Sequence, residues 1–213
     1  MAVDHIVVEG LIGAGKTTLA RRLATQRHAR LVLEEFDENP FLARFYEDPA
    51  RYAFTVELAF LAQRYQQLKR STEQDLFHPC TVADYSLPKS LIFASVTLQA
   101  DEHALFRDLF DIMYGDLPSP DLIIYLHLGQ DRLRERIRER GRSYEQHIQS
   151  DYLLNLQERY MDHLRKAKGS RVLVVDLGDT DLLHDGAAYA TLNERIDASD
   201  GPSYEVLHLG KHV

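Results

Sequence analysis

The sequence contains almost no cysteine: Cys80 is the only one in 213 residues, and tryptophan is absent. A single cysteine excludes an internal disulfide or a cluster of thiolate metal ligands, and it is typical of a reducing compartment. No apolar run approaches the roughly 18 residues that a membrane-spanning helix needs. The N-terminal residues also lack the basic segment and apolar core of an export signal. We therefore expect a cytoplasmic protein with no membrane partner.

The charge balance is acidic, with 33 Asp and Glu residues against 25 Lys and Arg residues and a net charge of -8. Nucleic-acid binders need a basic face that displaces counterions, so this balance argues against a nucleic-acid partner. It favours a small-molecule substrate instead. One segment departs from the acidic background, because residues 132–142 contain six arginines.

The apolar pattern predicts an α/β fold in which a parallel sheet of five strands has helices on both faces. Short apolar runs predict strands at 4–9, 30–35, 80–84, 121–127 and 171–176. Longer stretches between and after them predict helices at 15–26, 40–46, 50–68, 89–98, 101–114, 131–140, 144–168 and 187–196. The length fits a single domain over residues 1–213, with a loosely held tail at about 200–213.

A glycine-rich loop follows the first predicted strand and leads directly into the first predicted helix. Its pattern, Gly-x-x-x-x-Gly-Lys-Thr, is that of a phosphate-binding loop (P-loop). Backbone N–H groups and the helix N-terminus there favour anionic oxygen, Lys16 reaches the β- and γ-phosphates, and Thr17 coordinates Mg²⁺. The residues expected to bind the nucleotide are Gly10, Gly13, Ala14, Gly15, Lys16, Thr17 and Thr18.

A P-loop alone leaves three activities open: a phosphotransferase, a nucleotide-hydrolysing switch and a binding subunit without chemistry. The switch is disfavoured because the Asn-Lys-x-Asp and Asp-x-x-Gly motifs of GTPases are missing from their expected places. The motifs that decide are Glu9-Gly10, the segment 34–42 with Asn39-Pro40-Phe41-Leu42, Phe45-Tyr46, Glu57, Arg64, Asp84-Tyr85-Ser86, Phe93-Ala94 and the segment 140–145 with Arg140-Gly141-Arg142. In this order, over about residues 5–160, the chain resembles the deoxynucleoside kinases, particularly the bacterial deoxyguanosine and deoxyadenosine kinase branch.

The resemblance implies transfer of the γ-phosphate of ATP, with Mg²⁺, to the 5'-hydroxyl of a deoxynucleoside. It makes Glu34 the catalytic base, with Glu35 held in reserve because only one of two neighbouring strand residues can face the crevice. Asp84, at the end of the third predicted strand, could hold Mg²⁺ directly or through water. The arginine-rich segment, about 132–146, becomes a lid that closes over the nucleotide. The lid residues expected to act on the phosphates are Arg136, Arg140 and Arg142, while other arginines of the segment are solvated or paired with Glu135 and Glu139.

The resemblance also indicates the acceptor site. Tyr46 and Glu145 match positions that hold the sugar 3'-hydroxyl. Glu57 and Arg64 lie seven residues apart on one predicted helix, so both can face the base. Related kinases usually carry glutamine at the position of Glu57, whereas a carboxylate only accepts hydrogen bonds. Guanine offers two adjacent donors, so we expect deoxyguanosine to be favoured over deoxyadenosine, with Arg64 contacting O6 or N7.

The sequence departs from the family at Tyr85, where better-known members carry an arginine that steadies the base and the transferred phosphoryl group. Lys89 is a candidate for its replacement. Two alternatives stay open: a nucleoside monophosphate kinase resembling thymidylate kinase, and a catalytically weak nucleotide-binding regulatory subunit. By resemblance we expect a homodimer, or a heterodimer with a related kinase subunit, built on helices such as 50–68.

Overall fold

The computed structural model describes residues 3–35, 39–71, 78–114, 119–146, 148–182, 184–198 and 201–210. Residues 36–38 of the acidic motif lie outside these ranges. In the described chain, six parallel strands form one sheet in the order β2-β3-β1-β4-β5-β6. The strands are His5–Gly10 (β1), Arg30–Val32 (β2), Thr81–Ala83 (β3), Leu122–His127 (β4), Arg171–Asp176 (β5) and Tyr204–His208 (β6).

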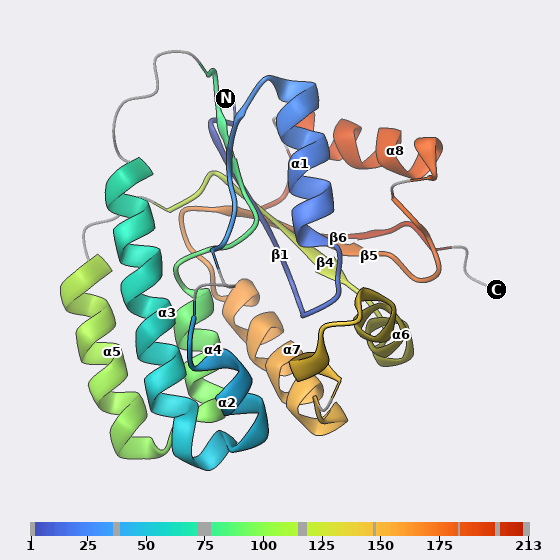
Figure 1. Cartoon of the computed structure of the whole chain (residues 1–213). Helices are drawn as coiled ribbons and strands as arrows, with labels where there is room; N and C mark the ends of the chain where they lie inside the picture. Colours follow the sequence, from blue (N-terminus) through green and yellow to red (C-terminus); the bar gives the residue numbers. More distant parts are fainter. Residues whose placement is uncertain are drawn as a thin grey trace.

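Helices cover both faces of this sheet, as the α/β prediction requires (Figure 1). They are Lys16–Arg27 (α1), Leu42–Glu47 (α2), Pro49–Ser71 (α3), Lys89–Thr97 (α4), Ala100–Tyr114 (α5), Gln130–Arg140 (α6), Ser150–Arg165 (α7) and Gly186–Asp197 (α8), with a 3-10 turn at Ser143–Glu145 (η1). Figure 1 shows α1 and α8 on one side of the sheet and α4 and α7 on the other, with α3 and α5 outside α4. No helix in the described ranges is both long and apolar enough to cross a membrane.

The main core lies between the sheet and the helices packed on it. Residues 122–126 of β4 are all buried, as expected for a central strand that is covered on both faces. A second apolar cluster joins α3, α4 and α5 around Leu61 and Phe106, which are both fully buried. This second cluster fixes the position of α3, the helix that carries Glu57 and Arg64.

The prediction of five strands is wrong, because part of the expected loose tail forms a sixth. Residues Tyr204–His208 pair in parallel with β5 at the edge of the sheet. The strand was missed because it follows loop-forming Gly201 and Pro202 and is only half-buried, with Val206 42% exposed.

One helix and one strand are shorter than the sequence predicts. The expected helix at 144–168 is a 3-10 turn followed by α7, which begins only at Ser150. The turn is held by local ion pairs, because the buried Glu145 accepts from Arg140 and Arg142. Strand β2 ends at Val32 rather than at residue 35, and the backbone N–H of Glu34 donates to the Asp84 carboxylate instead of to a neighbouring strand.

Candidate active site

The P-loop lies at the C-terminal end of β1, in the middle of the sheet. Gly15 has a left-handed φ of 94° and precedes α1. At Gly10, an added Cβ would lie 2.8 Å from the carbonyl oxygen of Leu126, so only glycine fits. These two glycines let the backbone turn sharply from the strand into the helix and aim its N–H groups at one volume.

Lys16 curls back over this loop. Its ammonium group donates to the carbonyl oxygens of Gly10, at 2.9 Å, and Leu11, at 3.1 Å. Burial, with repulsion from Lys89, lowers the pKa of Lys16 to about 8 against the opposing effect of nearby carboxylates. An anion bound in the loop would supply the negative charge that this buried ammonium group needs.

Thr17 and Asp84 meet beside the loop. The Thr17 hydroxyl donates to one oxygen of the buried Asp84 carboxylate, and the other oxygen accepts the backbone N–H of Glu34 at 2.7 Å. A hydroxyl and a carboxylate are the hard oxygen ligands that Mg²⁺ prefers. No group of three or more His, Cys, Asp or Glu residues in the described ranges could hold a metal. The Thr17–Asp84 pair therefore fits a Mg²⁺ ion by the chemistry of its oxygen atoms.

Glu34 lies between two cations. Arg64 donates from Nε to Oε1 at 3.0 Å, and the Lys89 ammonium group contacts Oε2. Burial alone would raise the pKa of Glu34, but the charges and hydrogen bonds of Lys89 and Arg64 outweigh it and lower the pKa to about 2. Glu34 is thus a carboxylate, able to accept a hydroxyl proton, throughout the neutral pH range. Its neighbour Glu35 is exposed.

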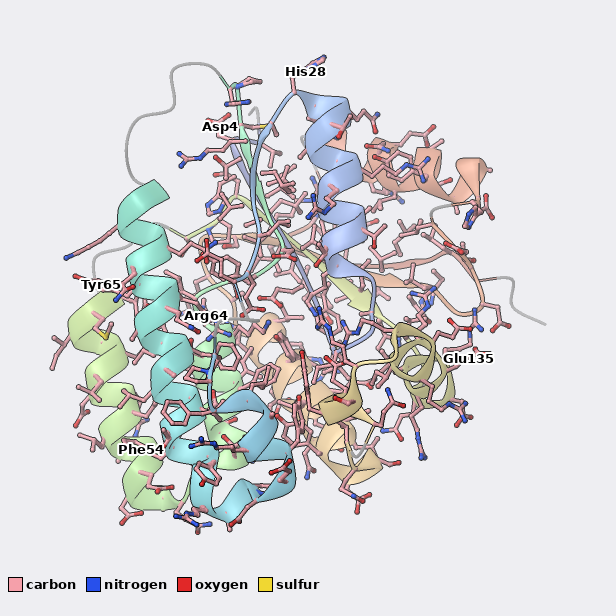
Figure 2. The ribbon with its side chains drawn as sticks, in the orientation of Figure 1. Asp4, His28, Phe54, Arg64, Tyr65 and Glu135 are labelled. Carbon is pink, nitrogen blue, oxygen red and sulfur yellow. The ribbon has the colours of Figure 1, made fainter. Side chains whose placement is uncertain are left out.

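Arg64 was expected to contact a nucleobase, but its guanidinium group is used elsewhere. Besides its bonds to Glu34, it donates to the Ser90 hydroxyl at 2.7 Å. Figure 2 shows Arg64 on the side of α3 that faces the sheet, and Tyr65 on the side of α5. The structure thus places Arg64 as a support for the Glu34 carboxylate.

A pocket opens in front of Glu34 and gathers every residue predicted for the acceptor site. Its polar lining includes Lys16, Thr17, Glu34, Tyr46, Glu57, Arg64, Asp84, Lys89, Arg140, Arg142 and Glu145. Its apolar lining includes Phe45, Val56, Phe60, Phe93 and Tyr152. An aromatic and apolar cavity with a few polar groups is the usual form of a small-molecule site.

The lid arginines lie on both sides of the P-loop. Arg140 and Arg142 both donate to the buried Glu145, from Nε at 3.0 Å and Nη1 at 3.3 Å respectively. Arg136 donates to the carbonyl oxygen of Ala14 at 3.3 Å. The prediction that some arginines pair with acids of their own helix is confirmed by the Arg132–Glu135 pair.

A second pocket lies on the other side of the loop, between α1, α6 and the end of β5. Its lining includes Gly13, Ala14, Gly15, Thr18, Arg136 and Arg140. The P-loop therefore separates two cavities, with Lys16 and Thr17 facing the one that contains Glu34. This arrangement suits a phosphoryl group that passes from a donor to an acceptor.

Comparison with known proteins agrees with this geometry. Residues 6–199 match the family model described as deoxynucleoside kinase. The chain is 36% identical over 152 residues to deoxyguanosine kinase of Bacillus subtilis (strain 168), covering 71% of this chain and 73% of the relative. It is 31% identical over 199 residues to deoxyadenosine/deoxycytidine kinase of the same organism, covering 90% of each.

The chain belongs to the deoxynucleoside kinase family. It is therefore an ATP-dependent phosphotransferase. The fold agrees: the structure of deoxyadenosine kinase from M. mycoides with bound dATP superposes with a TM-score of 0.78, at 23% identity, covering 91% of this chain and 100% of that one.

The structure of this kinase also explains motif residues to which the sequence assigned no contact. Glu9 is buried in β1, where it accepts the backbone N–H of Ser86 at 2.7 Å and the Tyr160 hydroxyl at 3.1 Å. The feature of the sequence that could have indicated this role is an acidic residue inside an otherwise apolar strand. Asn39 is buried and donates to the carbonyl oxygen of Val56 at 3.2 Å, which fastens the turn before α2 to α3.

Thr97 was missed altogether. Its hydroxyl, at the end of α4, lies 3.1 Å from Oε1 of Glu57 and 3.0 Å from the carbonyl oxygen of Phe93. Glu57 is only 3% exposed. Burial raises the pKa of Glu57 to about 7, although Arg64 and the Thr97 hydrogen bond act in the opposite direction. A threonine near the end of an apolar helix gives no signal of such a contact in the sequence.

Proposed function

We propose that this kinase transfers the γ-phosphate of Mg²⁺-bound ATP to the 5'-hydroxyl of a purine deoxynucleoside, with deoxyguanosine favoured over deoxyadenosine. The observation that carries the proposal is the position of Glu34. Its ionised carboxylate lies in a pocket that also contains Lys16 and Thr17 of the P-loop. A sugar placed between Glu34 and the P-loop would have its 5'-hydroxyl next to the Glu34 carboxylate and next to the γ-phosphate bound in the loop.

In this proposal Glu34 accepts the proton of the 5'-hydroxyl while the 5'-oxygen of the sugar attacks the γ-phosphate and ADP leaves. Lys89 and Arg64 hold the carboxylate in place and limit its rotation. Lys16 and the lid arginines Arg136, Arg140 and Arg142 stabilise the charge that spreads over the phosphate oxygens during transfer. Bound Mg²⁺, next to Thr17 and Asp84, would neutralise charge on the β- and γ-phosphates.

Tyr46 and Glu145 are proposed to hold the sugar, since both line the acceptor pocket. The Tyr46 ring stacks on Tyr144 of η1, with centroids 6.0 Å apart and planes 15° apart. This stacking connects the acceptor pocket to the lid. Glu57 lies among the apolar groups of the same pocket, in a position to read the edge of a base.

The cations of the acceptor pocket favour a nucleoside over a nucleoside monophosphate. Arg64 and Lys89, the cations next to the proposed catalytic base, are both bound to Glu34. An acceptor that carries its own phosphate would have to compete with this carboxylate for the two cations. A neutral sugar makes no such demand.

The purified chain alone, with ATP and Mg²⁺, tests the proposal in a coupled assay of ADP release. We expect turnover with deoxyguanosine, slower turnover with deoxyadenosine and none above background with dGMP. Turnover with dGMP alone would establish the monophosphate kinase instead. No turnover with any acceptor, despite ATP binding, would establish the regulatory subunit. Sedimentation of the same sample tests the proposed dimer.

A further inference from the structure

When Glu57 is ionised, the Thr97 hydroxyl has one proton but two neighbouring acceptors, the Glu57 carboxylate and the carbonyl oxygen of Phe93. The single Thr97 hydroxyl proton faces two acceptors at nearly equal distance, Oε1 of Glu57 at 3.1 Å and the carbonyl oxygen of Phe93 at 3.0 Å. A hydroxyl can donate to only one of them at a time. If the Thr97 hydroxyl donates to the carbonyl oxygen of Phe93, its oxygen can still bond to Glu57. That bond requires Glu57 to be protonated and to donate its own proton to the Thr97 oxygen.

Both protonation states of Glu57 therefore have a hydrogen-bonded arrangement in the free protein. An ionised Glu57 accepts from Thr97. A neutral Glu57 donates to Thr97, whose own proton then goes to the Phe93 carbonyl oxygen in the ordinary way of a helical threonine. Each arrangement gives Oε1 of Glu57 and the Thr97 hydroxyl a hydrogen-bond partner, although burial still disfavours the ionised state.

The surroundings of Glu57 keep these two states close in free energy. Within the described ranges Glu57 has no ion-pair partner. Arg64, on the same helix, and Lys89, on α4, are both bound to Glu34, whose own charge opposes ionisation of Glu57. Tyr46 of α2 and Tyr152 of α7 interact electrostatically with Glu57. The same pocket is also lined by Lys16, Asp84, Arg140, Arg142 and Glu145. Burial raises the pKa of both phenols, so they stay neutral near pH 7.

The two states of Glu57 present different patterns to a base. A carboxylate offers two acceptors, which match the adjacent N1–H and 2-amino donors of guanine. A neutral carboxyl group offers one donor and one acceptor, which match N1 and the 6-amino group of adenine. Each wrong combination leaves a buried polar group unpaired, which is costly.

We propose that Glu57 is a protonation-dependent selector of the base, so that one pocket takes guanine when Glu57 is ionised and adenine when Glu57 is neutral. The inference rests on the proposed function, because it assumes that the pocket holds the base of a deoxynucleoside. It modifies the simpler expectation of a fixed guanine preference. Selectivity between the two purines then depends on pH, while the reaction itself is the same for both.

The test is the ratio of kcat/KM for deoxyguanosine to that for deoxyadenosine, measured at saturating ATP from pH 6 to pH 8. Because kcat/KM at saturating ATP reports groups of the ATP-bound enzyme before the nucleoside binds, the ratio follows the ionisation of Glu57 in that form. Titration of ATP or of groups common to both reactions cancels. For a single group that titrates near pH 7, the ratio should rise with pH by up to about 100-fold.

Glu57→Gln supplies the decisive comparison, since its amide offers a donor and an acceptor at every pH. We expect this variant to favour deoxyadenosine with a ratio independent of pH. Glu158→Gln, at an exposed position of α7, should reproduce the wild-type curve. Calorimetric binding of the two nucleosides at the same pH values gives the same comparison if the Glu57 variant turns over slowly.

A wild-type ratio that is constant with pH would overturn the inference, as would the same pH dependence in Glu57→Gln. Both results would leave deoxynucleoside phosphorylation intact. If the wild-type chain neither phosphorylates nor binds either nucleoside at any pH, the proposed function itself fails.

Discussion

The ammonium group of Lys89 contacts the carboxylate of Glu34, across the gap between α4 and the segment that follows β2. By the family resemblance, Tyr85 stands where we expect related kinases to carry an arginine, and Tyr85 is buried next to Asp84. Lys89 thus adds a positive charge beside Glu34 that could replace the one expected from that arginine. The contact supports the proposed compensation, which was based only on the position of Lys89 in the chain.

If Lys89 replaces the missing arginine, Lys89→Met should lower kcat by about 100-fold, because charge that stabilises the transition state is lost. KM for the deoxynucleoside should change much less. Lys89→Arg keeps the charge and should recover most of kcat. Lys166→Met, at an exposed position after α7, serves as the control. A normal kcat for Lys89→Met in steady-state kinetics would show that the lysine has only a packing role.

The contact between Thr17 and Asp84 predicts how the reaction depends on Mg²⁺. Asp84→Asn removes the negative charge next to the proposed ion, so the Mg²⁺ concentration for half-maximal activity should rise by about 10- to 100-fold. Asp162→Asn, on the exposed side of α7, should leave the Mg²⁺ titration unchanged. An unchanged titration for Asp84→Asn would mean that this carboxylate acts only through its hydrogen bonds.

Two neighbouring leucines on α7 test the packing of the helix layer against the sheet. Leu153 is 1% exposed, whereas Leu154 is 43% exposed. Leu153→Ala should lower the free energy of unfolding by about 2–5 kcal/mol, since it leaves a cavity in the core. Leu154→Ala should change it by about 0.5 kcal/mol or less. Urea titration of both variants measures the difference, and equal losses would contradict the described position of α7.

Topology brings together the residues that the sequence predicts for the site. Lys16, Glu34 and Asp84 each follow a strand, and the C-terminal ends of parallel strands meet at one edge of the sheet. The strand order and direction alone place these residues together, without any knowledge of side-chain positions. The family pattern supplied Tyr46 and Glu145, which lie in the same pocket as expected.

The partners of the side chains could not be predicted in the same way. Whether Arg64 faces a base or Glu34 depends on the angle at which α3 packs against α4, and the apolar spacing of a helix does not specify that angle. The contact of Thr97 with Glu57 also depends on the angle between α3 and α4, so it could not be predicted either. Strand β6 was missed for another reason, because an edge strand with one exposed face carries too weak an apolar signal.

The central claim is that Glu34, and not Glu35, faces the reacting phosphate. The most direct measurement is kcat of Glu34→Gln beside that of Glu35→Gln, with binding of ATP and deoxynucleoside followed separately. We expect Glu34→Gln to lose about 10²- to 10⁴-fold in kcat, since an amide cannot accept the proton, while Glu35→Gln stays near wild type. Normal turnover by Glu34→Gln, or equal losses in both variants, would contradict the account.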